Sequence, residues 1–287
     1  MKGNLLNFII NTFRKFTLIH LHWMSFDIAA GAMILQSAFN RIPAGKTSIN
    51  SRITLTLGLG VFIISSLNRL LDNRKPAKTE TKRFLANQKE RISFLKIIAG
   101  ALFSVIIISL FLPEHLWKLL LSILICSGLC LFIGSKLPDK SILHSLREPV
   151  SAILLASGIL GTTYFLNLDY VRESKYIGAL ILLLVFQNFL LSSYFQAIEF
   201  PGTSNLVTLL KASLSKQILH GVTFLIVVGC IMVCFKTDFR YTQRLIIILM
   251  SMSLLQSFLL YKAQFLSSKK YKGLLVTLIL ILPFLVL

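Results

Sequence analysis

Two apolar stretches of the sequence carry polar residues three or four positions apart. The first stripe begins at the small residue Gly58, passes Val61 and continues with the polar residues Ser65, Asn68 and Asp72. The second consists of Asn188, Ser192, Gln196 and Glu199. Residues at this spacing share one face of a helix. Because polar groups inside a membrane are costly, such a stripe either lines a cavity that meets a ligand or forms hydrogen bonds between neighbouring helices. The spacing alone leaves both interpretations open.

Asp27 is one of only 11 acidic residues in the chain, and it lies inside a third apolar stretch. It shares a predicted helical face with His20, Trp23 and Gly31. An uncompensated carboxylate at that depth costs roughly 3 kcal/mol or more, so Asp27 needs a partner. One interpretation is a structural partner, either His20 or a hydroxyl group. The other is a bound cation or substrate.

The first stripe leads directly into the basic segment DNRKPAKTETKR, residues 72–83. The bases around this segment are Arg69, Arg74, Lys75, Lys78, Lys82 and Arg83. Guanidinium and ammonium groups can bind a diphosphate directly. A cytoplasmic loop also retains such residues simply because of the positive-inside bias. The mixture of acids with bases in this segment is less expected from that bias alone.

The elements that position these residues follow from composition. Hydrophobic residues make up 55% of the 287 residues and charged residues only 14%, which indicates a membrane protein. Nine apolar stretches reach the roughly 20 residues that a membrane-spanning helix needs. They are 16–39, 52–72, 93–112, 116–135, 149–167, 175–195, 216–235, 241–262 and 271–287. We expect a single all-helical transmembrane domain over residues 16–287, preceded by an interfacial helix at 1–15.

The basic residues predict the orientation of these spans. Of the 30 lysines and arginines, 21 lie in the N-terminal segment or beside the connections after the second, fourth, sixth and eighth spans. The N-terminus is therefore expected in the cytoplasm and the C-terminus on the opposite side, and we expect a bacterial inner membrane. Topology and anionic headgroups account for the net charge of +19, so no nucleic-acid partner is expected. The long polar connections, 73–92 and 196–215, both fall on the cytoplasmic side.

Nine helices with polar cytoplasmic connections after the second and sixth resemble the UbiA superfamily of intramembrane prenyltransferases, over essentially the whole chain. The first motif of that family runs Asn-Asp-x-x-Asp-x-x-x-Asp. The chain keeps Asn68 and Asp72 but has Arg69 and Pro76 at the other two positions. The second motif is a pair of acids four apart, of which only Glu199 is present, with Phe195 at the first position.

The resemblance implies a helical bundle around a central cavity and an enzyme that moves a polyprenyl group from its diphosphate to an aromatic or lipid acceptor. It implies that Asn68, Asp72 and Glu199 are catalytic and hold one Mg²⁺ ion, which neutralises the leaving diphosphate. The implied diphosphate contacts are Arg69, Arg74, Lys75 and Lys78, and the implied acceptor contacts are Asn188, Gln196 and Asp27. A non-catalytic isoprenoid-binding protein and a transporter that uses Asp27 are the alternative functions.

Overall fold

The computed structural model describes residues 25–72, 91–136, 146–166, 171–199, 205–263 and 272–287. Within these ranges the chain is helical and has no β-strand, which confirms the predicted all-helical class. In chain order the helices are α3 Phe26–Asn40, α4 Ser51–Asp72, α6 Arg91–Ser109, α7 Glu114–Lys136, α9 Arg147–Leu166, α10 Val171–Glu199, α11 Leu206–Leu210, α12 Ala212–Lys236, α13 Arg240–Tyr261 and α15 Lys272–Leu278, followed by the 3₁₀ helix η2 Ile279–Val286.

Five of the described helices are long and apolar enough to cross a membrane. The apolar segments are Ser51–Asn68, Glu114–Gly134, Ser174–Ile198, Ala212–Lys236 and Arg240–Tyr261. They support the prediction of a membrane protein. The other four predicted spans coincide with α3, α6, α9 and the pair α15 and η2. The nine-span topology stays a prediction, and the expected interfacial helix 1–15 lies outside the described residues.

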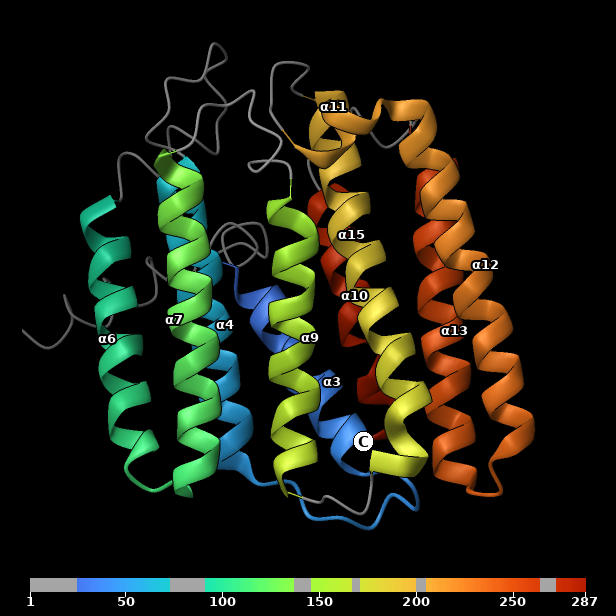
Figure 1. Cartoon of the computed structure of the whole chain (residues 1–287), viewed down its shortest axis with the longest axis horizontal. Helices are drawn as coiled ribbons and strands as arrows, with labels where there is room; N and C mark the ends of the chain where they lie inside the picture. The colour runs from blue at the N-terminus through green and yellow to red at the C-terminus, as the bar shows by residue number, and fades with distance from the viewer. Residues whose placement is uncertain (1–24, 73–90, 137–145, 167–170, 200–204, 264–271) are drawn as a thin grey trace, which may run out of the picture.

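The long helices run alternately up and down in one bundle (Figure 1). The helix ends that flank the connections predicted to be cytoplasmic all lie at the upper end of Figure 1, where α4, α7, α10 and α13 end. The connections 41–50, 110–113 and 237–239 lie at the opposite end. This arrangement agrees with the alternation that the positive-inside pattern predicts. Which end faces the cytoplasm stays a prediction.

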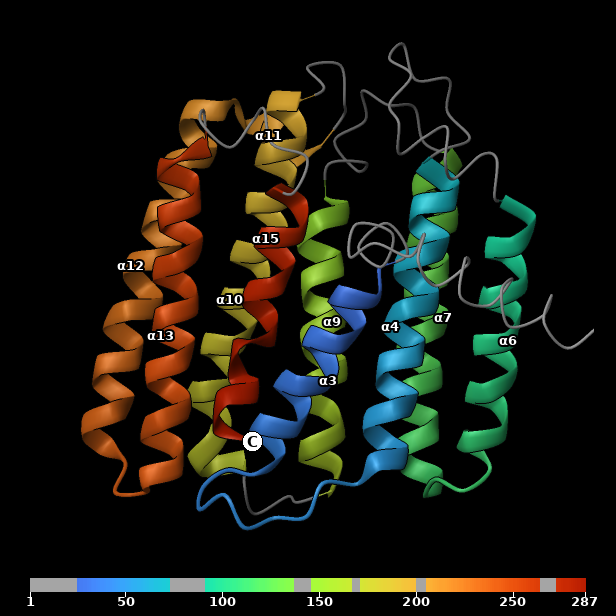
Figure 2. The ribbon, with the colours of Figure 1, turned by 180° about the vertical axis from the view of Figure 1, so that it is seen from behind.

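Two helices occupy the interior of the bundle. α3 packs against α4, α9 and η2, and α10 packs against α9, α12 and α13. The view from behind shows α3 beside α15 and η2 (Figure 2). Small residues allow this close packing, since a Cβ atom added at Gly31 of α3 would lie 2.6 Å from the Cβ of Leu280 in η2. Both helices are buried over much of their surface, polar residues included, for example Gln36 of α3 and Asn188 of α10.

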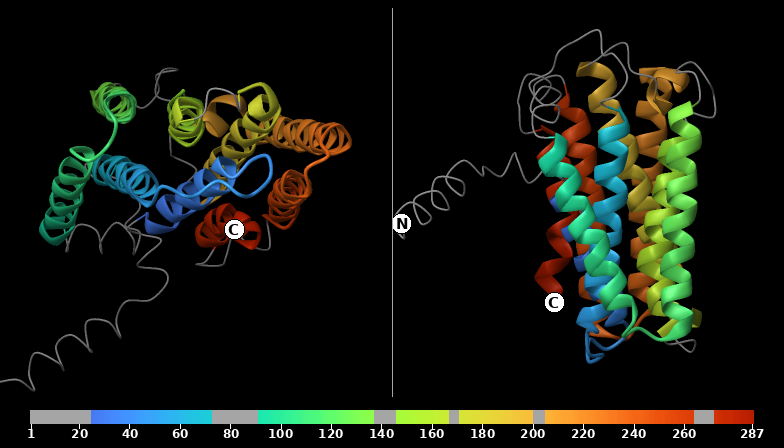
Figure 3. Two further views of the ribbon diagram at one scale, coloured as in Figure 1. Left: turned by 90° about the horizontal axis from the view of Figure 1, so that it is seen from below. Right: turned by 90° about the vertical axis from the view of Figure 1, so that its left-hand side faces the viewer.

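The periphery of the bundle is formed by α6 on one side and α12 on the other, as the view from below shows (Figure 3). α6 packs chiefly against α4, and α7 packs against α4 and α9. Large apolar side chains are exposed on these outer helices, such as Phe103 of α6 and Phe224 of α12. Exposed apolar residues of this kind suit contact with lipid chains. The outer helices thus expose an apolar surface of the kind that lipid chains cover. The space between α4, α6, α7 and α9 holds a pocket.

Candidate functional site

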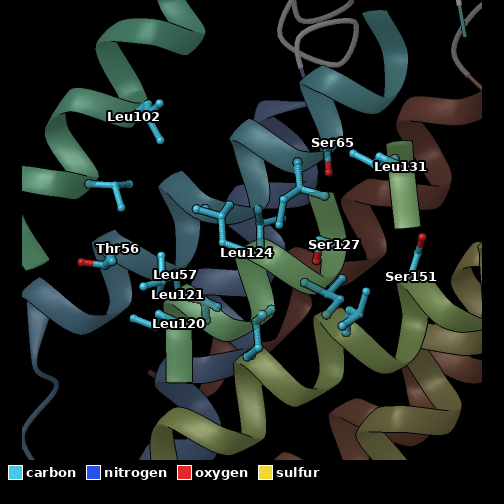
Figure 4. A pocket seen from close by; sticks show the side chains of 18 of the residues that line it. Thr56, Leu57, Ser65, Leu102, Leu120, Leu121, Leu124, Ser127, Leu131 and Ser151 are labelled. Carbon is cyan, nitrogen blue, oxygen red and sulfur yellow. The ribbon is translucent and has the colours of Figure 1, made fainter. Parts of the chain in front are cut away.

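A pocket of about 330 Å³ lies between α4, α6, α7 and α9. Most of its lining is aliphatic, for example Leu57 of α4, Leu102 of α6, Leu121 and Leu124 of α7 and Leu155 of α9. Figure 4 shows these walls converging from separate helices. α3 and α10 each contribute one further residue. Among the described residues, no charged side chain lines the pocket, so its body suits an apolar chain.

Three serines and one amide lie toward one end of this pocket, and the hydroxyls of Thr56 and Ser109 lie toward the other. Ser65 and Asn68 come from the last turns of α4, Ser127 from α7 and Ser151 from the second turn of α9. Figure 4 shows the three serines on one side of the pocket and Thr56 on the other. The Thr56 hydroxyl donates to the carbonyl oxygen of Arg52 in its own helix, at 2.8 Å. Ser109 Oγ donates to the carbonyl oxygen of Ile106 in its own helix, at 2.7 Å. The end near Asn68 is therefore where a polar group of a ligand finds partners.

At this end of the pocket, Asn68 has a buried polar atom without a hydrogen-bond partner in the described part of the chain. The atom is Oδ1, and the side chain as a whole is partly buried. Leaving a buried acceptor unsatisfied costs roughly 1–3 kcal/mol, so such atoms are usually satisfied by a ligand, an ion or water. The prediction that Asn68 belongs to a binding site is thus consistent with its place in the pocket.

The other predicted metal ligands lie at the same end of the bundle. Asp72 is the last residue of α4, one turn after Asn68, and Glu199 is the last residue of α10. The structure describes the backbone of Arg69, Asp72 and Glu199 but not their side chains. Amide and carboxylate oxygens are ligands that Mg²⁺ accepts, so the residue types fit this ion and Asn68 has an acceptor atom to offer. The shared Mg²⁺ site stays a prediction.

Arg74, Lys75 and Lys78, predicted to bind the diphosphate, lie outside the described residues. They follow α4 directly in the sequence, after its last residue Asp72. In the described part of the chain, no three His, Cys, Asp or Glu side chains lie close enough together to hold a metal ion. A metal site at the pocket would therefore need at least one side chain that the structure does not describe, such as that of Asp72 or Glu199.

Asn188 and Gln196 of the second stripe do not line the pocket. Asn188 is buried, and its Nδ2 atom donates to the carbonyl oxygen of Val276 in α15 at 2.9 Å. Gln196 is exposed, near the end of α10. For Asn188 the structure thus shows the helix-to-helix hydrogen bond that was one of the two interpretations of the stripes. The predicted contacts of both residues with an acceptor remain untested.

Asp27 is buried in the first turn of α3 and accepts a hydrogen bond from Thr277 Oγ1 of α15. A hydroxyl group was one of the structural partners expected for this carboxylate. His20, the other, lies outside the described residues. Asp27 does not line the pocket, although its neighbour Ile28 does. Its observed hydrogen bond joins the first described helix to the last α-helix of the chain.

Three polar residues near the pocket's polar end carry no distinctive pattern in the sequence: Ser127, Ser151 and Glu148. Ser127 and Ser151 are lone hydroxyl residues in apolar stretches, where hydroxyls commonly bond to their own helix, so no spacing distinguishes them. Glu148 lies just before the predicted fifth span and accepts a hydrogen bond from Ser193 Oγ of α10 at 3.1 Å. In the sequence, Glu148 is distinguished only as one of the 11 acidic residues.

No protein-family model, curated protein or solved structure matches the chain.

Proposed function

We propose that this chain is an integral membrane protein that binds a polyprenyl diphosphate. The prenyl chain occupies the pocket between α4, α6, α7 and α9, and the diphosphate lies at the Asn68 end. One observation carries this proposal: the pocket has aliphatic walls, and its polar end is formed by the part of α4 that leads into the basic segment 73–83. An amphiphile with one apolar chain and an anionic head matches both features.

The two ends of this pocket contribute differently to recognition. A prenyl chain that is already dissolved in lipid gains little hydrophobic free energy in an apolar pocket, because lipid tails are equally apolar. Packing against the pocket walls selects for shape. The anionic head supplies most of the selectivity, through the acceptor and donor groups at the Asn68 end and the predicted contacts with Arg74, Lys75 and Lys78. Recognition of the head should therefore depend on ionic strength.

Prenyl transfer is the second candidate function. It is favoured by Asn68 and Asp72 on consecutive turns where α4 meets the pocket's polar end, as in the first motif of the prenyltransferases that the sequence resembles. In this reaction the bond between the first prenyl carbon and the diphosphate oxygen breaks, and the acceptor attacks that carbon and loses a proton. Bound Mg²⁺ would neutralise the leaving diphosphate. The aliphatic walls would exclude water from the allylic cation.

The test is binding of geranylgeranyl diphosphate to the purified protein in detergent, measured calorimetrically with and without Mg²⁺. Gly60 of α4 lines the pocket, and a Cβ atom added there would meet nothing within 4 Å. Gly60→Phe should therefore fill the pocket from within and weaken binding by at least about tenfold, the equivalent of 1.4 kcal/mol. Gly128→Phe on α7 is the matched control, because Gly128 is exposed and also has open space around it.

Comparing the two variants distinguishes a filled pocket from a general effect of an added phenylalanine on binding. Each introduces the same side chain at a helical glycine, and only Gly60 lines the pocket. Loss of binding in Gly60→Phe alone supports the proposal. Equal binding in both variants, or no binding by the unmodified protein, contradicts it. Asp72→Ala then addresses transfer: a protein that still binds the diphosphate but no longer consumes it in the presence of an acceptor supports the second function.

A further inference from the structure

The three serines at the polar end of the pocket have unused hydroxyl groups. Within the described part of the chain, the hydroxyls of Ser65, Ser127 and Ser151 form no hydrogen bond, and all three residues line the pocket. Ser127 is only 3% exposed, so its hydroxyl is withdrawn from the outer surface of the bundle. Figure 4 shows the three serines on the same side of the pocket. Three helices thus bring unused hydroxyl groups to one end of an apolar cavity.

Other serines of the long helices have hydroxyls that are already bonded. Ser104 of α6, Ser122 of α7 and Ser251 of α13 each donate to a backbone carbonyl oxygen of their own helix, at 3.0, 2.7 and 2.9 Å. None of these three lines the pocket. A hydroxyl in apolar surroundings costs free energy when it lacks such a bond. The serines of the pocket are therefore placed to form their hydrogen bonds with a ligand.

The ligand group that meets these serines is uncharged. Among the described residues, no charged side chain lines the pocket. Moving a phosphate into apolar surroundings without paired positive charges costs far more free energy than hydrogen bonds from neutral hydroxyls return. Phosphate groups therefore belong beyond Asn68, toward the basic segment 73–83, and a neutral oxygen atom belongs among the serines.

The hydrogen-bonding groups at this end of the pocket fit an alcohol. Asn68 Oδ1 is a buried acceptor that has no donor in the described part of the chain. The serine hydroxyls are available as donors. An alcohol carries one O–H donor and two acceptor lone pairs, so it can donate to Asn68 and accept from the serines. A ketone or ester group has no donor and would leave Asn68 Oδ1 unsatisfied.

We propose that the pocket also binds a polyprenol, the uncharged primary alcohol of a prenyl chain. The alcohol donates to Asn68 Oδ1 and accepts from the hydroxyls of Ser65, Ser127 and Ser151, and the chain lies between the aliphatic walls. This inference goes beyond the proposed function and shares with it only the place of the prenyl chain. The alcohol needs no contact with the basic segment 73–83, so residues that the structure describes form the whole site.

The experiment is calorimetric titration of the purified protein in detergent with geranylgeraniol and with its methyl ether. The ether keeps the prenyl chain and the acceptor oxygen but lacks the O–H donor. A triple variant, Ser65→Ala with Ser127→Ala and Ser151→Ala, removes the hydroxyls from the pocket. The matched control replaces the three helix-bonded serines of α6, α7 and α13 by alanine, which removes the same number of hydroxyls outside the pocket.

Geranylgeraniol should bind the unmodified protein about tenfold more tightly than the ether, because only the alcohol donates to Asn68 Oδ1. The triple pocket variant should lose about tenfold in affinity for the alcohol, since more than one hydrogen bond is removed. The control variant should match the unmodified protein. Equal affinity for alcohol and ether, or an unchanged affinity for the alcohol in the pocket variant, overturns the inference.

The pocket variant should unfold at the same temperature as the unmodified protein or above it, because its serines make no hydrogen bond within the described part of the chain. If it does not fold, Ser127→Ala alone decides the question: a several-fold loss of affinity for the alcohol supports the inference, and an unchanged affinity overturns it.

Parallel titration with geranylgeranyl diphosphate separates this inference from the proposed function. Binding of the diphosphate without binding of the alcohol refutes only the inference. Binding of the alcohol without the diphosphate refutes only the proposed function. No binding of either removes both.

Discussion

Asn68 and Asn188 are both amides in the interior of predicted membrane spans, yet the structure gives them different surroundings. Asn188 Nδ2 donates to the carbonyl oxygen of Val276, which joins α10 to α15. Asn68 lines the pocket, and its Oδ1 atom has no partner in the described part of the chain. The first amide already contributes to the fold, and the second has hydrogen-bonding capacity left for a ligand.

Replacing each amide by alanine should therefore have opposite consequences. Asn188→Ala leaves the Val276 carbonyl without its donor and should lower the free energy of unfolding by roughly 1–3 kcal/mol, while the folded protein still binds geranylgeranyl diphosphate. Asn68→Ala should leave stability nearly unchanged and weaken that binding several-fold. Thermal unfolding in detergent and calorimetric titration give the two readouts. Equal loss of stability in both variants would contradict the distinction.

A second prediction at this scale concerns the buried carboxylate of α3. Thr277→Val removes the hydroxyl that donates to Asp27 and replaces it with a methyl group of similar size. We expect a loss of roughly 1–3 kcal/mol in the free energy of unfolding, because Asp27 is then left without this donor in a buried site. Thr208→Val, at an exposed position of α11, should lower the free energy of unfolding by less than Thr277→Val does. Thermal unfolding of the two variants tests the difference, and equal loss would contradict a special role for Thr277.

At the scale of elements, the contact between α3 and η2 depends on a residue without a side chain. A Cβ atom at Gly31 would lie 2.6 Å from Leu280 Cβ, which is too close for two carbon atoms. α3 also packs against α4 and α9, so it cannot move away from η2 without disturbing the centre of the bundle. The close approach of α3 and η2 is thus a requirement of the whole interior.

Gly31→Ala should destabilise the protein by roughly 1–3 kcal/mol, since the added methyl group overpacks this contact. Gly221→Ala is the matched control on α12, because Gly221 is exposed and a Cβ atom there would meet nothing within 4 Å. The control should be neutral or slightly stabilising, given the better helix propensity of alanine. Thermal unfolding in detergent measures both effects. A Gly31→Ala protein as stable as the control would show that α3 and η2 can separate freely.

At the scale of the whole molecule, the charge distribution predicts which end of the bundle faces the cytoplasm. Gln196 is exposed near the upper end in Figure 1, where α10 ends, and Lys118 is exposed at the opposite end, near the start of α7. The positive-inside pattern places the Gln196 end in the cytoplasm. These two positions therefore report on the orientation of the entire helix bundle.

Single cysteines at these positions provide the test, in a chain whose four native cysteines are replaced by alanine. With the protein expressed in bacterial spheroplasts, a membrane-impermeant maleimide should label Lys118→Cys from outside. Gln196→Cys should be labelled only after the membrane is opened. The reverse pattern would invert the predicted orientation, and labelling of both positions from outside would contradict a fully spanning bundle.

The sequence by itself determined the class of this protein. Apolar length and composition are local properties, so the membrane character and the helical segments could be predicted without knowing any contact. A helix is present in the described part of each of the nine predicted spans. The alternation of their ends was also predictable, because consecutive helices that each cross a membrane run in opposite directions.

Only the tertiary structure decided what each polar residue does. The bond from Thr277 to Asp27 joins residues 250 positions apart, and the bond from Asn188 to Val276 spans 88 positions. Helical spacing shows that Asn188 shares a face with other polar residues, but the neighbour of that face depends on how distant helices pack. The pocket likewise requires Asn68, Ser127 and Ser151 to converge from three helices. Local patterns cannot predict such convergence, because packing of the whole bundle determines which side chains meet.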